Sequence, residues 1–269
     1  MPELPEMETY RRLLQPRLVN RPIIGVEVNR EKSVNIPVEQ FRSALLSRSI
    51  THVDRVAKQL IFRLNDGHQL IVHLMLGGWM FYGREADRPD RTIQVRISFG
   101  PESLYFINLR LGHLHWINDH ELQHIIDRYG LDPYAPELNA TVLHKLLTTR
   151  RTALKIALID QGLVAGIGNC YSDEICYTAG LLPTRSCSSL TLEESERLLV
   201  AMRHVLSDAT NYGGYMDHPL YVGDTLTGGY DERCQVYDRE GEPCLRCREP
   251  IIHETVRNRK TYYCISCQR

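Results

Sequence analysis

The segment Gln161-Gly162-Leu163-Val164-Ala165-Gly166-Ile167-Gly168-Asn169 lies between two stretches with helical periodicity, residues 153–160 and 171–179. Its glycines allow a tight turn. The residues that follow begin a new helix, whose first N–H groups have no partner within the helix and can bind an anion. We therefore predict a helix, two turns and a second helix, an arrangement suited to gripping a phosphate. Two glycines before a helix are also common in ordinary turns, so this segment needs support from the rest of the chain.

The predicted elements on either side differ in kind. Helical periodicity recurs at residues 141–147 and 192–209, whereas residues 129–138 contain a glycine and two prolines and read as a linker. Residues 6–18 form an amphipathic pattern typical of a helix. Between that helix and the linker, alternating or β-branched runs are separated by Gly, Asn, Asp and Pro. These runs are residues 23–28, 50–56, 59–64, 69–76, 79–82, 92–99 and 103–107.

Four cysteines near the end of the chain form two pairs with metal-ligand spacing. Cys244-x-x-Cys247 is followed by Cys264-x-x-Cys267, and paired CxxC motifs of this kind bind a tetrahedral zinc ion. Four thiolates leave no open coordination position, so we expect one structural Zn²⁺. Free thiols or disulfides are the alternative reading of the same cysteines.

Composition limits the function classes only loosely. The 269 residues are 43% hydrophobic and carry a formal net charge of −1, which is typical of a folded protein but not of a strongly basic nucleic-acid binder. No apolar stretch is long enough to cross a bilayer, and the amino-terminal segment lacks the features of a secretory signal. Positive charge is concentrated in the final segment, where a phosphate backbone could lie. In this segment, residues 244–269, the basic residues are Arg246, Arg248, Arg257, Arg259, Lys260 and Arg269.

These patterns together predict an α+β protein with several domains. Residues 1–130 form an N-terminal helix plus an antiparallel β-sandwich, and residues 131–138 form the linker. Residues 139–234 form a helical domain with the helix-two-turn-helix motif, and residues 235–269 form a C-terminal zinc ribbon.

The chain begins Met1-Pro2-Glu3-Leu4-Pro5-Glu6. Once Met1 is removed, Pro2 carries a secondary amine, which can attack an electrophilic carbon and form an iminium ion. The same residues also suit an ordinary helix start, because proline needs no N–H partner there and the glutamates suit the positive end of the helix dipole. If Met1 stays attached, the nitrogen of Pro2 is held in a peptide bond and no nucleophile exists. Small second residues generally permit removal, so we expect a mature Pro2 terminus.

Four segments, in order along the whole chain, resemble the formamidopyrimidine-DNA glycosylase and endonuclease VIII family, and the chain lies nearer the formamidopyrimidine branch. The segments are Pro2-Glu3-Leu4-Pro5-Glu6, Val56-Ala57-Lys58, Gly166-Ile167-Gly168-Asn169 followed by Tyr171 and Glu174, and Gln235-Val236-Tyr237 leading to Gly241-Glu242-Pro243-Cys244. The terminal zinc ribbon agrees with the same family.

The resemblance implies a base-excision repair enzyme with glycosylase and abasic-site lyase activities. Such an enzyme flips a damaged nucleotide out of duplex DNA, because the reacting atoms cannot be reached inside the base stack. By resemblance, Pro2 attacks the anomeric carbon, and β,δ-elimination of the two phosphates follows. Glu3 would be the acid and base near the sugar ring oxygen, and Glu6 would hold the amino terminus. Lys58 would contact a flanking phosphate and assist departure of the base, although a lone lysine is otherwise more often a solvated surface residue.

The resemblance also implies contacts to DNA. His73, Asn169, Tyr237 and Arg259 match residues that hold the DNA backbone. Arg110 matches an arginine that faces the orphan base. Leu76 falls at the position of the wedge that fills the gap left by the flipped nucleotide, and Leu111 replaces an expected phenylalanine. Leucine can fill the gap but stacks less well than an aromatic ring.

Three functions remain open from the sequence. Residues 213–234 are as long as the loop that folds over 8-oxoguanine in the formamidopyrimidine branch, so the resemblance favours removal of oxidised purines, namely 8-oxoguanine and formamidopyrimidines. The glycines of this segment suggest mobility. A catalytically weakened protein that binds lesions or abasic sites is the second possibility, motivated by Leu76 and Leu111. A glycosylase for oxidised pyrimidines is the third. In each case we expect damaged double-stranded DNA as partner, no membrane, a monomer, and a cytoplasmic location that is associated with the nucleoid if the source is bacterial.

Overall fold

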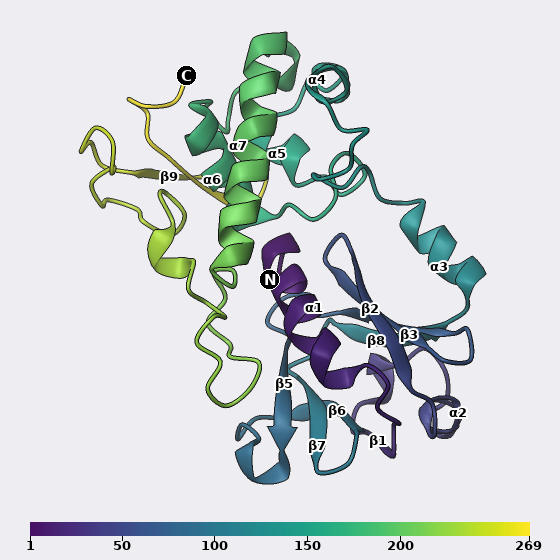
Figure 1. Ribbon diagram of the computed structural model, residues 1–269. Helices are drawn as coiled ribbons and strands as arrows, with labels where there is room; N and C mark the ends of the chain where they lie inside the picture. The colour runs from purple at the N-terminus through teal and green to yellow at the C-terminus, as the bar shows by residue number, and fades with distance from the viewer. The chain divides into compact units, whose positions relative to one another are not determined.

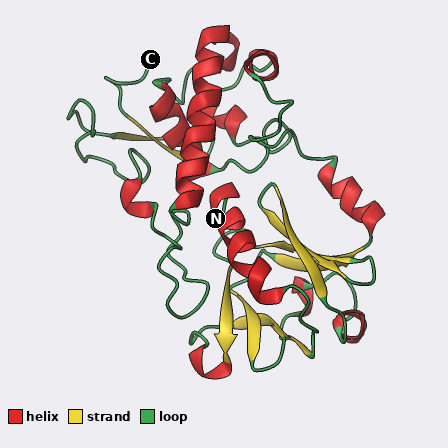
Figure 2. Cartoon of the chain, viewed as in Figure 1, coloured by secondary structure: helices red, strands yellow, loops and turns green.

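The computed structural model describes residues 1–269, which divide into two compact units (Figure 1). The first unit contains Met1–Asp127 and Tyr212–Gly229, and the second contains Arg128–Asn211 and Tyr230–Arg269. The first holds the antiparallel sheets of the sandwich, and the second is mostly helical (Figure 2). None of the helices combines the length and the apolar composition needed to cross a membrane.

Two four-stranded antiparallel sheets make up most of the first unit. One has the order β1-β6-β7-β5 and the other β2-β3-β4-β8. The strands are β1 (Gly25–Val28), β2 (Ile50–Val56), β3 (Gln59–Leu64), β4 (Gln69–His73), β5 (Trp79–Arg84), β6 (Ile93–Ser98), β7 (Glu102–Ile107) and β8 (His113–Ile117). The helices of this unit are α1 (Leu4–Leu18), α2 (Val38–Leu45) and α3 (Asp119–Ile126), with short 3-10 turns η1 (Glu31–Ser33) and η2 (Glu85–Asp87).

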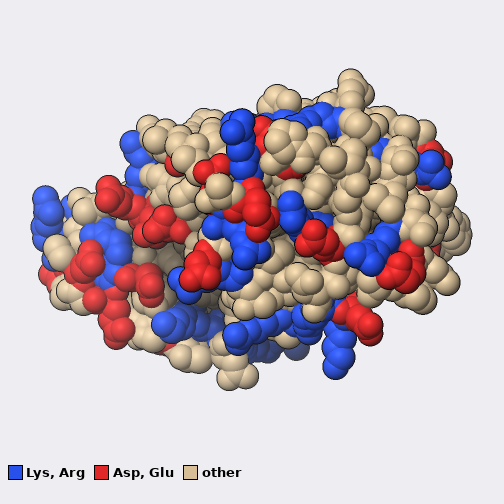
Figure 3. All heavy atoms as spheres, turned by 90° about the horizontal axis from the view of Figure 1, so that it is seen from below, with Lys and Arg blue, Asp and Glu red and all other residues tan.

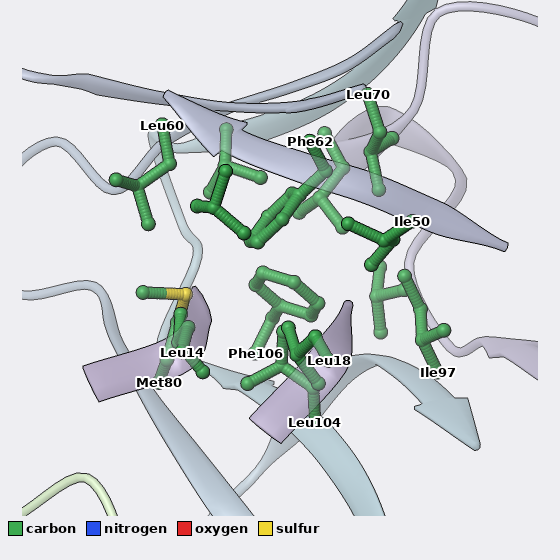
Figure 4. Close-up of a cluster of buried hydrophobic side chains, with 14 of the residues drawn as sticks. Leu14, Leu18, Ile50, Leu60, Phe62, Leu70, Met80, Ile97, Leu104 and Phe106 are labelled. Atoms are coloured by element: carbon green, nitrogen blue, oxygen red, sulfur yellow. The ribbon is translucent and has the colours of Figure 1, made fainter. Parts of the chain in front are cut away.

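The main core lies between the inner faces of these two sheets. Leu60 and Phe62 point from β3 toward Leu104 and Phe106 on β7, as expected when alternate strand residues face one side (Figure 4). The buried face of α1 joins the same cluster through residues spaced three and four apart. These are Met7, Tyr10, Leu14 and Leu18. The outer face of the β2-β3-β4-β8 sheet is covered by α3 through Leu122.

Residues 212–229 follow the helical part of the chain but pack with the first unit. Leu220 is fully buried in the core of the sandwich, and its carbonyl oxygen accepts a hydrogen bond from the N–H of Tyr82 on β5 at 2.6 Å. The carboxylate of Asp224 accepts hydrogen bonds from the N–H groups of Leu220 and Leu226 at 2.8 and 3.0 Å. This segment is therefore folded by its own hydrogen bonds and by one buried anchor.

The second unit is built around its longest helix, α7 (Leu192–Asn211), which packs against α6 (Asn169–Ala179) and α4 (Ala140–Thr148). The remaining elements are α5 (Leu154–Leu158), η3 (Cys187–Ser189), η4 (Asp231–Arg233) and the antiparallel hairpin of β9 (Ile252–Val256) and β10 (Arg259–Tyr263). The predicted linker contains no helix or strand. Its backbone is nevertheless held, because the Arg203 side chain on α7 donates hydrogen bonds to the carbonyl oxygens of Pro133, Ala135 and Leu138.

The α+β class, the antiparallel sheets and the helix-two-turn-helix unit are confirmed, and three elements were missed. These are α2, β8 and α3, the last two of which fall in residues 108–128 that no sequence pattern assigned. The predicted boundaries also differ from the observed units, because residues 212–229 were expected within a helical domain of residues 139–234. The cause is the Leu220 anchor, a contact with a distant part of the chain that local patterns cannot report.

We predict that Leu220→Ala lowers the free energy of unfolding by about 2–4 kcal/mol, because it leaves a cavity in a well-packed core. The matched control is Val222→Ala in the same segment, where the side chain is 70% exposed. That change should cost no more than about 0.5 kcal/mol. Urea denaturation measures both, and equal losses would contradict the anchoring of this segment.

Candidate functional site

The amino terminus is buried at the start of α1. Pro2 is buried, and Glu3 and Glu6 are only 1% and 2% exposed. Glu3 caps the helix and forms a capping box with Glu6, whose Oε2 accepts a hydrogen bond from the Glu3 N–H at 2.8 Å. The structure thus brings together the three residues that the sequence predicted at this end.

The segment 212–229 supplies the next residues around the amino terminus. The other carboxylate oxygen of Glu6, Oε1, accepts a hydrogen bond from the backbone N–H of Tyr215 at 2.8 Å. Gly214 makes this approach possible: its φ is 76°, and a Cβ there would lie 2.2 Å from Glu6 Oε1. The ring of His218 stacks on Trp79 at 4.8 Å, and burial, together with the charge of the terminal amine, lowers the pKa of His218.

Lys58 lies in the tight turn between β2 and β3. Its neighbour Ala57 has a φ of 53°, and Val56 pairs with Gln59 across the turn. Lys58 is only 6% exposed, so it is not a solvated surface lysine. Burial and the charge of Lys58 lower the pKa of His73 to about 4, which keeps this imidazole neutral.

His73 ends β4 and is paired with His113 on β8. Its Nδ1 accepts a hydrogen bond from the N–H of Met75 at 3.1 Å, which leaves Nε2 to carry the proton of the neutral ring. Burial, followed by the charges of His115 and His73, lowers the pKa of His113 to about 4. The rings of His113 and His115 are stacked at 4.0 Å. The turn holding Lys58 therefore adjoins a set of uncharged imidazoles.

Two loops of the first unit carry the predicted wedge residues. Leu76 and Leu111 are 67% and 64% exposed, and Arg110 is also exposed. The loops are tied together by a hydrogen bond of 2.8 Å from Asn108 Nδ2 to the carbonyl oxygen of Gly77. Exposed leucines on connected loops are available to an external partner, and neither leucine contributes to the core.

The helix-two-turn-helix segment is held by the side chain of Gln161. Its Nε2 donates to the carbonyl oxygens of Ile159 and Ile167 at 2.8 and 2.7 Å, and its Oε1 accepts from the N–H of Gly166 at 2.9 Å. Gly166 has a φ of 94°, which explains why glycine occupies this position. Asn169 follows these turns as the first residue of α6, and it is half-buried. At this end of a helix the first backbone N–H groups have no partner within the helix.

Consecutive carboxylates on α6 connect this helix to the C-terminal ribbon. Glu174 accepts hydrogen bonds from the backbone N–H groups of Gln235, Val236 and Tyr237, at 2.8, 2.9 and 2.8 Å. Its neighbour Asp173 accepts from the N–H of Tyr262 on β10 at 3.1 Å. Tyr237 and the hairpin that carries Arg259 are therefore both positioned from α6.

A fully buried ion pair completes this connection. Lys155 Nζ lies 2.6 Å from Asp173 Oδ2, and both side chains are 0% exposed. Lys155 also donates to the backbone carbonyl oxygens of Asn169 on α6 and Lys260 on β10. Burial raises the pKa of Asp173, and the Lys155 ammonium opposes that shift. One lysine thus links α5, the first residue of α6 and the hairpin.

The four predicted metal ligands come together in the ribbon. The sulfur atoms of Cys244, Cys247, Cys264 and Cys267 all lie within 4.8 Å of one another, so they could hold a metal ion. The Sγ atoms of Cys244 and Cys267 lie 3.8 Å apart, and those of Cys247 and Cys264 lie 3.4 Å apart. A tetrahedral site with metal–sulfur bonds of about 2.3 Å has sulfurs about 3.8 Å apart, so the cluster fits such an ion.

Arg259 begins β10, immediately after the turn of the hairpin. Arg257 and Asn258 form this turn with φ values of 46° and 63°, a pattern typical of tight hairpins. Arg257, Arg259 and Lys260 are all exposed. On the face shown in Figure 3, acidic and basic side chains are interspersed. The exposed basic residues of the hairpin are consistent with an anionic partner.

Sequence reasoning missed several residues that shape these sites. The sequence places Lys155 only in a predicted helix and Tyr215 only in a predicted loop. The single available signal for Lys155 was a lysine placed among apolar residues in Ala153-Leu154-Lys155-Ile156-Ala157-Leu158. Gln161 lies within the predicted turn, but nothing in the sequence predicts its hydrogen bonds.

Comparison with known proteins agrees with both units. Residues 1–114 match the model of the formamidopyrimidine-DNA glycosylase N-terminal domain, and residues 129–217 match the formamidopyrimidine-DNA glycosylase H2TH domain. A formamidopyrimidine-DNA glycosylase of Pelotomaculum thermopropionicum is 35% identical over 275 residues, covering 100% of this chain and 99% of the relative. The Escherichia coli enzyme of the same name is 33% identical over 271 residues, covering 100% of both.

Solved structures give the same result. The Lactococcus lactis protein in complex with DNA containing an abasic site has a TM-score of 0.92 at 28% identity, covering 99% of each chain. The Thermus thermophilus MutM protein has a TM-score of 0.88 at 32% identity, covering 99% of this chain and 98% of that one. Fold and site define a DNA glycosylase. The chain belongs to the formamidopyrimidine-DNA glycosylase family.

We predict that Lys155→Met lowers the free energy of unfolding by about 3–5 kcal/mol, because it leaves the buried Asp173 carboxylate without its counter-charge. The double variant Lys155→Met/Asp173→Asn should recover part of this loss, because the asparagine is neutral and can still accept from Tyr262. Urea denaturation of the three proteins measures both effects. A single variant as stable as the parent protein would contradict the role of the pair.

Proposed function

We propose that this protein removes oxidised purines from duplex DNA and then cleaves the strand, with the amine of Pro2 as the nucleophile. One observation carries the proposal: Pro2 is buried at the start of α1 beside two buried carboxylates, Glu3 and Glu6. An amine in this setting is protected from bulk water and has acid–base groups at hand. Relatives bound to DNA with an abasic site or a formamidopyrimidine lesion support the choice of substrate.

In the proposed reaction, the Pro2 nitrogen attacks the C1′ atom of the damaged nucleotide. The bond from C1′ to the base breaks, and the base leaves with the electron pair and takes up the proton that the Pro2 nitrogen loses. Opening of the sugar ring then gives an iminium ion between Pro2 and C1′, which makes the C2′ proton acidic. Its removal expels the 3′ phosphate, and a second elimination expels the 5′ phosphate.

The nearby side chains have separate tasks in this proposal. Glu3 supplies the proton that the ring oxygen takes up as the ring opens. Glu6 holds the start of α1 against Tyr215, which fixes the direction of the Pro2 nitrogen. Lys58 is buried in its turn and places a positive charge where a phosphate or a departing base can be stabilised.

We assign the DNA backbone contacts to His73 in the first unit and to Asn169, Tyr237 and Arg259 in the second. The neutral His73 ring has a donor at Nε2, and Asn169 adds an amide at a helix N-terminus. Such contacts hold the duplex without reading its sequence. Arg110 and the exposed Leu76 and Leu111 would occupy the space that a flipped nucleotide leaves.

We propose that the four-cysteine cluster holds one structural zinc ion, because the ligands are all thiolates and leave no open position. Intact-mass measurement under non-denaturing conditions should find one zinc per chain. Cys267→Ser should lose the metal and weaken DNA binding, because the hairpin carrying Arg259 then loses its support. Full zinc content with undiminished DNA binding in that variant, or another metal in the parent protein, would contradict the proposal.

Borohydride trapping tests the catalytic proposal. The protein, checked by mass for loss of Met1, is mixed with duplexes that contain 8-oxoguanine opposite cytosine, a plain abasic site or an oxidised pyrimidine. We expect a covalent adduct with the 8-oxoguanine duplex, weakened in Pro2→Gly. Glu3→Gln should slow the reaction by about 10²-fold or more, as for loss of an acid–base group.

The other outcomes separate the remaining functions. Adduct with the oxidised pyrimidine but not with 8-oxoguanine would assign a different lesion class. Binding without any adduct would favour a lesion-binding protein, which the exposed Leu76 and Leu111 in place of an aromatic wedge would suit.

A further inference from the structure

Tyr215 lies beside Met1, the residue that is bonded to the nitrogen of Pro2. In this chain the nitrogen of Pro2 is bonded to the carbonyl carbon of Met1, the position that the sugar C1′ would take in the covalent intermediate. The Met1 backbone therefore stands in for the sugar. The Tyr215 hydroxyl lies 3.3 Å from the Met1 carbonyl oxygen and 3.3 Å from the Met1 nitrogen. The hydroxyl thus contacts the carbonyl oxygen of Met1 and also its backbone nitrogen, which lies on the Cα side of that carbonyl carbon.

The position of Tyr215 is fixed by its backbone. Its N–H donates to Glu6 Oε1 at 2.8 Å, and the preceding Gly213 and Gly214 have φ values of 78° and 76°. A Cβ on Gly213 would lie 2.0 Å from the carbonyl oxygen of Leu226. The turn therefore packs closely against residue 226 of its own segment and against Glu6 of α1. The segment is anchored further along by Leu220 in the core. The backbone that carries the phenol is therefore fixed in this structure.

A phenol suits this position chemically. Its hydroxyl can donate a hydrogen bond to an oxygen that gains negative charge. When C1′ replaces the Met1 carbonyl carbon, the ring oxygen O4′ is the substituent that corresponds to the Met1 oxygen. This oxygen takes the electron pair when the C1′–O4′ bond breaks.

We propose that Tyr215 is a further catalytic residue, whose hydroxyl donates a hydrogen bond to the sugar ring oxygen as Pro2 becomes bonded to C1′. This inference rests on the function proposed above. The proton that O4′ finally keeps comes from the Glu3 carboxyl, and Tyr215 stabilises the charge that develops before that transfer. No further reactant is needed.

The test compares Tyr215→Phe with the parent protein on a plain abasic-site duplex, which carries no base for the phenol to contact. Single-turnover trapping should slow by about tenfold to a hundredfold, as for loss of one donor to a developing oxyanion. Affinity for a tetrahydrofuran abasic analogue should change much less, because no charge develops on its ring oxygen. The backbone bond to Glu6 is kept in this variant, so an unchanged unfolding midpoint is expected.

Tyr212→Phe, an exposed tyrosine in the same segment, is the matched control and should trap at the parent rate. An unchanged trapping rate in Tyr215→Phe would overturn the proposal. A loss seen with 8-oxoguanine but absent with the abasic site would also overturn it, because the phenol would then contact the base. Failure of the parent protein to form any adduct would instead refute the proposed function itself.

Discussion

The Glu6 carboxylate is the interaction on which the amino-terminal site depends. One oxygen accepts the N–H of Glu3 and the other accepts the N–H of Tyr215, so a single side chain joins the start of α1 to a segment more than two hundred residues away. At 2% exposure, this carboxylate cannot exchange those donors for water without cost. The requirement for glycine at position 214 follows directly, since any Cβ would collide with the same carboxylate.

In the second unit, buried carboxylates also accept hydrogen bonds from backbone segments that are distant in sequence. Buried carboxylates on α6, Asp173 and Glu174, hold the backbone of the C-terminal ribbon, and Lys155 balances part of their charge. A hairpin this small buries little apolar surface of its own. Its position is set by polar contacts to α6, by a small buried cluster that includes Tyr177 of α6 and Tyr262 of β10, and by the four-cysteine cluster. In both units, charge buried in the scaffold fixes residues that we assign to DNA.

Much of the fold could be predicted from local sequence patterns. The turn at Lys58 and the strands around it were predicted at their observed bounds, because β-branched alternation and a tight turn are local features. β8 was missed because His113 and His115 interrupt the usual strand composition. The packing of residues 212–229 and the role of Tyr215 could not be predicted, because Leu220 follows a proline in a glycine-rich loop. Its burial depends entirely on contacts distant in sequence.

The central claim is that the nitrogen of Pro2 is the nucleophile. Peptide mapping by mass spectrometry of the borohydride-trapped complex tests it most directly. We expect a reduced sugar remnant on the α-nitrogen of Pro2, in the tryptic peptide that ends at Arg11. A remnant on Lys58 or another lysine would contradict it, and so would a trapped complex in which Met1 is still attached.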